Sequence, residues 1–104
     1  GVNYIVAKEG DTFESLAEIF CISARNLRKF NDLKGKAQPV RGEQIYIDRK
    51  QKRWEGNARH HIVTEGETVA SVAQSYALRE KSLRKLNRLK AGAALRSGQT
   101  LRIR

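Results

Sequence analysis

The chain has 104 residues and a mass of 11.8 kDa, which fits one ordinary domain or two very small ones and is too short for most enzymes. Its 21 Lys and Arg residues against 11 Asp and Glu residues give a net charge of +10, which first suggests nucleic acid, an anionic membrane surface or an anionic polymer as the partner. Its single cysteine excludes an intramolecular disulfide and a cysteine-based metal cage.

The first predicted element is a strand over Tyr4–Ala7, because this short segment is aromatic and β-branched and a Glu-Gly pair follows it. A helix is expected next, since four apolar residues recur at helical spacing: Phe13, Leu16, Ala17 and Phe20. Either Asp11 or Thr12 can cap this helix, and Glu14 stands three residues after Asp11, as in a capping box. Cys21 follows the helix and is expected to be a small core residue.

A second short helix is expected after Ser23, which can cap it, with Leu27 and Phe30 facing inward and an end near Asn31. After a loop, Gln44–Ile47 alternates polar and apolar residues and predicts a second strand. The expected order of elements is strand, helix, helix, strand.

The same pattern recurs about 56 residues later. Tyr4–Asp48 aligns without a gap with His60–Arg104, and roughly 14 of the 45 aligned positions are identical. The chain is therefore predicted to hold two copies of one unit, over residues 3–48 and 60–104, joined by a basic linker over residues 49–59.

Two strands that enclose two helices most simply pair antiparallel, with both helices packed on one face of the sheet, which is an α+β fold. The loop after the first strand, Glu9–Phe13, is then expected beside the loop after the second helix, Asn31–Gly35. These loops are expected to flank a shallow groove. Because so small a unit buries a modest core, the sequence does not predict a deep catalytic pocket.

A spaced pattern runs through both copies. It comprises Gly-Asp-Thr at residues 10–12, an Ala within the first helix and an aromatic at its end, Leu27 and Asn31 around the second helix, and Gly-Gln-Thr-Leu-Arg-Ile at residues 98–103. This pattern resembles the LysM domain, and the resemblance covers nearly the whole chain apart from the linker. It implies two non-catalytic βααβ modules that bind N-acetylglucosamine-containing glycans, chiefly bacterial peptidoglycan and chitin, without a cofactor or a metal.

The order and spacing are also similar to the tandem LysM tails of cell-wall glucosaminidases and amidases from Bacteroides-like bacteria. This likeness implies a monomeric targeting or anchoring module of a cell-wall hydrolase or envelope protein, in the periplasm or outside the cell. The apolar runs are too short for a transmembrane helix or a signal-peptide core. Gly1 in place of a starting methionine, with no Met in the chain, favours an excised piece of a longer protein.

The family's sugar-binding loops, carried over position by position, fall on eight residues in each copy. In the first copy these are Gly10, Asp11, Thr12, Phe13, Asn31, Asp32, Leu33 and Lys34. In the second copy they are Gly66, Glu67, Thr68, Val69, Asn87, Arg88, Leu89 and Lys90. Two adjoining loops can supply the donor, the acceptor and the apolar surface that an N-acetyl group needs. Helix capping and turn formation are the alternative roles for Asp11, Thr12 and Thr68.

The second copy departs from the family pattern at several positions. Glu67 stands where Asp is expected, Arg79 replaces the capping Ser23, and Arg88 replaces Asp32. The second copy is therefore expected to bind differently from the first, or hardly at all.

Other side chains suggest chemistry less strongly. His60 and His61 are adjacent on a predicted strand and so point to opposite faces, which disfavours a shared metal ion. Trp54 and Tyr46 are candidates for exposed aromatic rings, and Trp54 is expected to dock between the copies or to stack on a ligand.

The charge is unevenly distributed. The net charge is zero over residues 1–48, +4 over residues 49–59 and +6 over residues 60–104. An electrostatic contact of the linker and the second copy with nucleic acid or an anionic envelope surface is therefore the alternative function. Because no nucleic-acid motif and no interleaved aromatic residues accompany the basic residues, specific recognition of nucleic acid is not expected.

Overall fold

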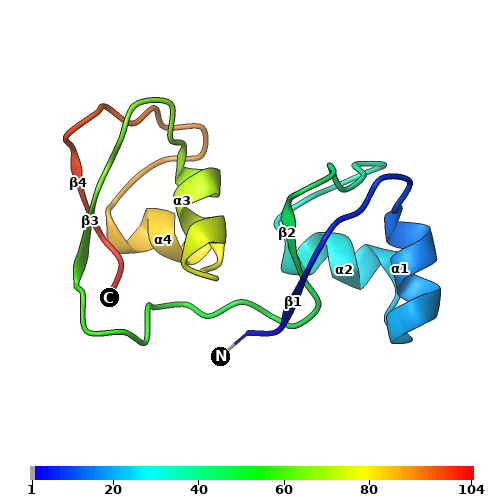
Figure 1. Cartoon of the computed structure of the whole chain (residues 1–104). Coiled ribbons are helices and arrows are strands. Elements are labelled where there is room, and N and C mark those ends of the chain that lie inside the picture. The colour runs from blue at the N-terminus through cyan, green and yellow to red at the C-terminus, as the bar shows by residue number, and fades with distance from the viewer. Residues whose placement is uncertain (1) are drawn as a thin grey trace. The chain divides into compact units, whose positions relative to one another are not determined.

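The computed structural model describes residues 2–104, which form two compact units (Figure 1). The first unit ends at Lys50 and the second begins at Gln51. Each unit contains a strand, two helices and a second strand in that order, and its two strands pair antiparallel. The predicted α+β fold of two βααβ units is therefore confirmed.

The elements of the first unit are β1 (Tyr4–Val6), α1 (Phe13–Phe20), α2 (Ala24–Phe30) and β2 (Gln44–Tyr46). In the sheet Tyr4 lies opposite Tyr46 and Val6 lies opposite Gln44. The elements of the second unit are β3 (His60–Ile62), α3 (Val69–Ser75), α4 (Glu80–Leu86) and β4 (Thr100–Arg102). Here His60 lies opposite Arg102 and Ile62 opposite Thr100, so the register is the same in both units.

Thr12 caps α1, and the alternative with Asp11 and Glu14 is wrong. The Thr12 hydroxyl accepts from the Ser15 backbone N–H at 2.9 Å, while the Ser15 hydroxyl accepts from the Thr12 backbone N–H at 3.0 Å. Thr68 and Ser71 form the same reciprocal pair at α3. Because Ser15 already completes the box, Glu14 is free to contact a more distant part of the chain.

Ser23 caps α2 as the sequence predicts, and its hydroxyl accepts from the Asn26 backbone N–H at 3.1 Å. The helix ends one residue before Asn31, but the left-handed conformation falls on the next residue, Asp32, with φ of 57°. Arg79 caps α4 without a side-chain hydrogen bond, so only the first unit keeps this cap.

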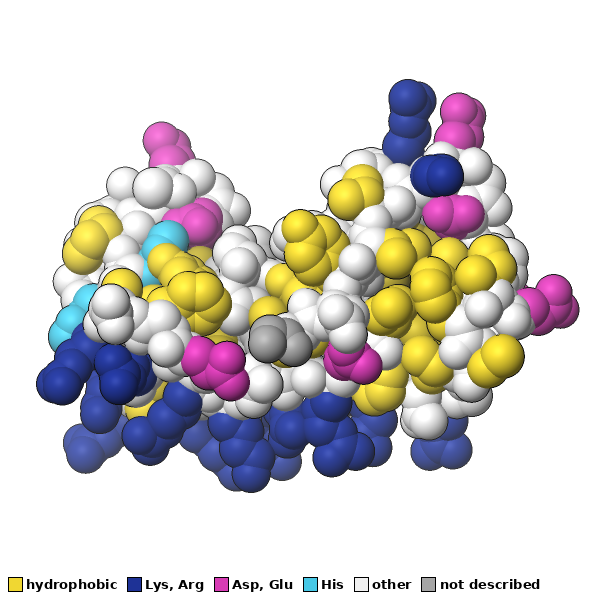
Figure 2. All heavy atoms as spheres, turned by 60° about the horizontal axis from the view of Figure 1, so that its bottom comes forward, with side chains coloured by type: hydrophobic (Ala, Val, Ile, Leu, Met, Phe, Trp, Pro, Cys, Tyr) yellow, Lys and Arg dark blue, Asp and Glu magenta, His cyan; other side chains and the backbone are white. Residues whose placement is uncertain are grey.

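Each unit has its own hydrophobic core. The first core consists of Ala7, Phe13, Leu16, Leu27 and Ile45. The second core is larger and consists of Val63, Val69, Val72, Ala73, Leu78, Leu83, Leu101 and Ile103. Figure 2 shows further apolar side chains on the surface of the first unit, on the right of that view.

The exposure of Cys21 and of Tyr46 differs from the prediction. Cys21 is exposed rather than buried, because the chain turns at this residue with φ of 56° between α1 and α2. Tyr46 is buried rather than exposed, because the Tyr4 ring, in a T-shaped arrangement, and the Lys50 side chain lie against its ring.

Part of the predicted linker packs on the second unit. Gln51 pairs with the backbone that follows α3. Its N–H donates to the Ala77 carbonyl, and its carbonyl accepts from the Arg79 N–H. Trp54 is half-buried against the second core, edge-on to Tyr76 at 5.2 Å between ring centres. Trp54 therefore belongs to the fold of the second unit.

Candidate functional site

The turn after the first strand has the same construction in both units. Lys8 N–H donates to Asp11 Oδ2 at 2.8 Å and Asp11 N–H donates back to the Lys8 carbonyl at 3.1 Å. In the second unit Thr64 and Glu67 form the equivalent pair, at 2.7 Å and 3.2 Å. Glu67 therefore makes the same two turn contacts as Asp11, and its replacement of Asp leaves the turn intact.

The glycines of these turns are the residues that permit them. Gly10 has φ of 87° and Gly66 has φ of 85°, in the left-handed region that favours glycine. Both residues are exposed, and a Cβ atom at either would meet nothing within 4 Å. A ligand can therefore approach the backbone of these turns closely.

The next two positions in each unit point inward or cap a helix. Thr12 and Thr68 are the caps already described. The side chains of Phe13 and Val69 are 0% and 4% exposed and belong to the cores. A ligand can reach Phe13 and Val69 only through their backbone.

Asn31 and Asn87 lie at the start of the second loop and bond the backbone. Asn31 Nδ2 donates to the carbonyls of Leu27 and Tyr46, and its Oδ1 accepts from Tyr46 N–H. Asn87 makes the same three hydrogen bonds, to the backbone of Leu83 and Arg102. These amides tie the end of each second helix to the end of the following strand.

The residues after the asparagines differ in their surroundings. Asp32 forms an ion pair with Lys50, whose side chain is almost entirely buried. Arg88, at the equivalent place, is exposed and has a φ of 55°. Leu33 is 36% exposed, whereas Leu89 packs partly against the second core. Lys34 and Lys90 are both exposed.

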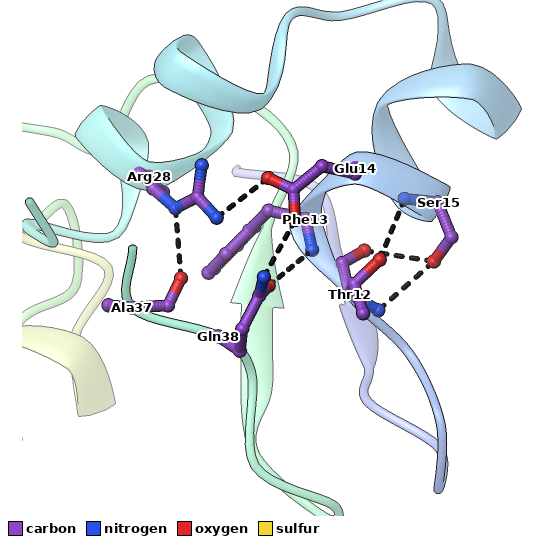
Figure 3. A network of polar contacts seen from close by, with 7 residues as sticks. All are labelled: Thr12, Phe13, Glu14, Ser15, Arg28, Ala37 and Gln38. Carbon is purple, nitrogen blue, oxygen red and sulfur yellow. Dashed lines mark hydrogen bonds and ion pairs between the residues drawn. The ribbon is translucent and has the colours of Figure 1, made fainter. Parts of the chain in front are cut away.

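The sequence predicts that Asn31–Gly35 lies beside the first loop, but the residue of the second loop that contacts the start of α1 is Gln38. Gln38 Oε1 accepts from Phe13 N–H at 2.9 Å, and Gln38 Nε2 donates to Glu14 Oε1 at 2.6 Å (Figure 3). Ala7 also pairs with the end of this loop, since its N–H donates to the Glu43 carbonyl. Asn31 lies instead beside Tyr46, the last residue of β2.

Arg28 completes this network in the first unit. Its Nη2 donates to Glu14 Oε2 at 2.7 Å and its Nε donates to the Ala37 carbonyl at 2.9 Å (Figure 3). The hydrogen bonds from Gln38 and then Arg28 hold the pKa of the Glu14 carboxyl below its ordinary value. Sequence reasoning missed this network, and comparing the two copies gives no signal for it, because Ala70 and Ala94 stand where the first copy has Glu14 and Gln38.

The second unit has a different polar group, formed by His61, Glu67 and Tyr76. His61 Nε2 lies 2.8 Å from Glu67 Oε1, and His61 Nδ1 lies 2.8 Å from the Tyr76 hydroxyl. The hydrogen bond from the Thr64 backbone N–H, followed by that from His61, lowers the pKa of the Glu67 carboxyl. His60 is exposed, so the two histidines face different surroundings as the strand geometry requires.

Among residues 2–104 the structure shows neither a candidate metal cluster nor a membrane-spanning helix. Within residues 2–104, no group of three or more His, Cys, Asp and Glu side chains is arranged to hold a metal ion. The described helices contain seven or eight residues each, and none between residues 2 and 104 is able to cross a bilayer.

Basic side chains are exposed in large number on the second unit. Figure 2 shows Lys and Arg side chains gathered along the lower edge of that unit, on the left of the view. Its exposed basic residues include Lys52, Arg53, Arg59, Lys81, Lys85, Arg88, Lys90, Arg96, Arg102 and Arg104.

Comparison with protein families finds the LysM domain twice, over residues 5–48 and residues 61–104. Among solved structures, the spore cortex-lytic enzyme SleL of Bacillus cereus is 23% identical with a TM-score of 0.44, over 99% of this chain and 22% of that chain. SleL of Bacillus megaterium QM B1551 is 24% identical with a TM-score of 0.42, over 99% of this chain and 23% of that one. The present chain thus spans less than a quarter of either enzyme. No curated protein sequence matches it.

Proposed function

The chain belongs to the LysM domain family over both of its units, and on that premise we propose that it targets or anchors a cell-wall hydrolase or another envelope protein to peptidoglycan. LysM domains bind N-acetylglucosamine-containing glycans such as peptidoglycan, they are not catalytic, and they occur in proteins associated with the cell wall. The envelope location and the anchoring role of this particular chain are part of the proposal.

The observation that carries the proposal is that the first loop of each unit exposes its backbone at a glycine. An acidic side chain closes each turn from within, at Asp11 and at Glu67. This leaves an exposed glycine with positive φ on the outside, at Gly10 and at Gly66. Backbone groups next to these glycines can bond the N-acetyl amide of a sugar, which needs one acceptor and one donor.

The second loop supplies the apolar part of the proposed contact. Leu33 is partly exposed directly after Asp32 and can pack against the methyl of an N-acetyl group. Lys34 is exposed beside it and can bond sugar hydroxyls. Asn31, by contrast, supports the site from inside, because its amide is engaged with backbone groups.

Each unit is small, and a contact of this kind is weak by itself. Two linked units gain affinity when both engage one polymer, because the second binding event becomes intramolecular. The proposed target, a repeating glycan, offers many sites along one strand. A monomer with two units is sufficient for this mechanism.

The proposal is tested by a pull-down of the chain on insoluble peptidoglycan and on chitin, at low salt and at about 0.5 M salt. Binding is expected to persist at high salt and to be reduced by soluble chitooligosaccharide. Binding that disappears at high salt and does not respond to the soluble sugar contradicts the proposal.

A second candidate is an electrostatic contact with nucleic acid or an anionic envelope surface. The exposed basic residues of the linker and the second unit favour it, since residues 49–104 carry the whole net charge. The same pull-down distinguishes it, because counterion release makes such binding fall steeply with salt.

A further inference from the structure

The two units keep one arginine at the same place but surround it differently. Arg28 of α2 and Arg84 of α4 occupy equivalent positions in the repeat. In the first unit the Arg28 guanidinium donates to the Glu14 carboxylate and to the Ala37 carbonyl. Its central carbon also lies 5.2 Å from the centre of the Phe13 ring. The positive charge of Arg28 is therefore neutralised and covered within the first unit.

The side chains that do this are absent from the second unit. The repeat replaces Glu14, Gln38 and Phe13 with three short residues, namely Ala70, Ala94 and Val69. Ala70 and Ala94 are exposed, so neither position offers a carboxylate or an amide to the arginine. The second unit has kept the arginine but not these three side chains, and the carboxylate that pairs with Arg84 is that of Glu80, one turn earlier on α4.

The contacts of Arg84 reflect this loss. Its Nε is buried and has no hydrogen-bond partner among the described residues, whereas Arg28 Nε bonds the Ala37 carbonyl. The Glu80 carboxylate lies 3.7 Å from Arg84 Nε, so the two form an ion pair that is too long for a hydrogen bond. The Arg84 side chain as a whole is 23% exposed against 12% for Arg28, so more of it is open to a ligand, although its Nε is buried.

We propose that Arg84 binds a carboxylate carried by the glycan, in the place that the Glu14 carboxylate takes beside Arg28. An arginine and a carboxylate form a strong, charge-assisted pair with a defined geometry. Ala70 and Ala94 leave room for the sugar that carries the group. This inference rests on the proposed function, because it assigns a ligand chemistry to the glycan surface of the second unit.

The two units are then expected to differ in the glycan that they prefer. Peptidoglycan carries carboxylates, either on the lactyl ether of muramic acid or on the attached peptide, whereas chitin carries none. The first unit, whose arginine is already paired, accepts either glycan. The second unit favours the carboxylated one. The chain as a whole thereby distinguishes peptidoglycan from chitin.

The test uses the full chain and two substitutions of equal size at one exposed position. Ala70→Glu installs the carboxylate that the first unit has at Glu14, and Ala70→Gln is its neutral counterpart. Ser75→Glu, at the other end of α3, makes the same change in net charge away from Arg84. Thermal unfolding verifies that all three variants are folded.

Affinity is measured calorimetrically for chitotetraose, for a peptide-free tetrasaccharide of alternating N-acetylglucosamine and N-acetylmuramic acid, and for the same tetrasaccharide bearing its peptides. Ala70→Glu is expected to weaken binding of a carboxylated tetrasaccharide about three- to tenfold and to leave chitotetraose unchanged. Ala70→Gln and Ser75→Glu should change neither. The two carboxylated ligands show whether the lactyl group or the peptide supplies the carboxylate.

The inference is overturned when the unmodified chain binds all three glycans equally and Ala70→Glu changes none of them; the proposed function then still stands. An equal loss with Ser75→Glu also overturns it, because general repulsion would then account for the effect. If the chain binds none of the three glycans, the proposed function fails together with this inference.

Discussion

The side-chain amide of Asn31 bonds both backbone groups of Tyr46, the last residue of β2. Nδ2 donates to the Tyr46 carbonyl at 2.9 Å, and Oδ1 accepts from the Tyr46 N–H at 2.8 Å. The same Nδ2 also donates to the Leu27 carbonyl at 2.8 Å. One buried side chain thus joins the end of α2 to the sheet, and Asn87 does so in the second unit.

Asn31→Ala is expected to destabilise the first unit by about 2–4 kcal/mol, because three hydrogen bonds are lost and buried backbone groups remain without partners. Chemical denaturation followed by circular dichroism measures this change. Asn26→Ala is the control, since Asn26 is exposed on the same helix and its substitution should cost less than about 0.5 kcal/mol. Equal effects of the two substitutions would show that the amide of Asn31 is not a structural tie.

Trp54 is the only tryptophan and packs against the second core, so its fluorescence should report unfolding of the second unit alone. Leu83→Ala in the second core is expected to lower the free energy of unfolding measured by this signal by about 2–5 kcal/mol. Leu27→Ala, a matched change in the first core, should leave the Trp54 transition in place. A common shift in both variants would mean that the units unfold together.

Glu67 is expected to make the second unit sensitive to acid. Its pKa is lowered from the ordinary value of 4.5 in the folded state, first by the Thr64 backbone N–H and then by His61. The stability that it contributes is therefore present above that value and is lost as the pH falls through the lower folded pKa. Glu67→Gln should flatten the decline of stability below pH 4.5, measured by Trp54 fluorescence in denaturant. An unchanged pH profile would contradict this role.

Leu33→Ala tests the apolar part of the proposed glycan contact. Leu33 is partly exposed, so its truncation should change stability by less than about 0.5 kcal/mol. Loss of its contact with an N-acetyl methyl is expected to weaken chitotetraose binding roughly fivefold, measured by calorimetry. Val40→Ala is the matched control, because Val40 is exposed in the same loop but lies outside the proposed contact. Similar losses in both variants would argue against a specific contact at Leu33.

The arrangement of elements followed from the sequence because each signal occurs twice. The helical spacing of Phe13 and Leu16 recurs at Val69 and Val72, and these residues do form the buried faces of α1 and α3. A period that appears in two aligned copies is much less ambiguous than one that appears in a single short segment.

The errors concern residues whose surroundings come from distant parts of the chain. Glu14 looks like a capping residue until Gln38 and Arg28 are brought beside it. Tyr46 occupies a polar position of an alternating strand, which predicts an exposed ring, yet Lys50 lies over that ring. Such contacts depend on how a long loop returns to the sheet, and local spacing does not encode that path.

For the same reason, the residues proposed to bind glycan include both exposed and buried side chains. Spacing located the two loops, but it did not distinguish the exposed Gly10 from the buried Phe13 three residues later. It also did not show that Asn31 faces inward. The exposed subset of these residues is the part that remains available to a ligand.

The most direct test of glycan binding is a titration of the isotopically labelled chain with chitotetraose in about 0.3 M salt, followed by backbone amide chemical shifts. The largest shifts are expected at the two turns, at Gly10 and Thr12 and at Gly66 and Thr68, with smaller changes at the Lys and Arg residues of the linker. Amides of both turns that stay unmoved at saturating sugar would contradict this expectation.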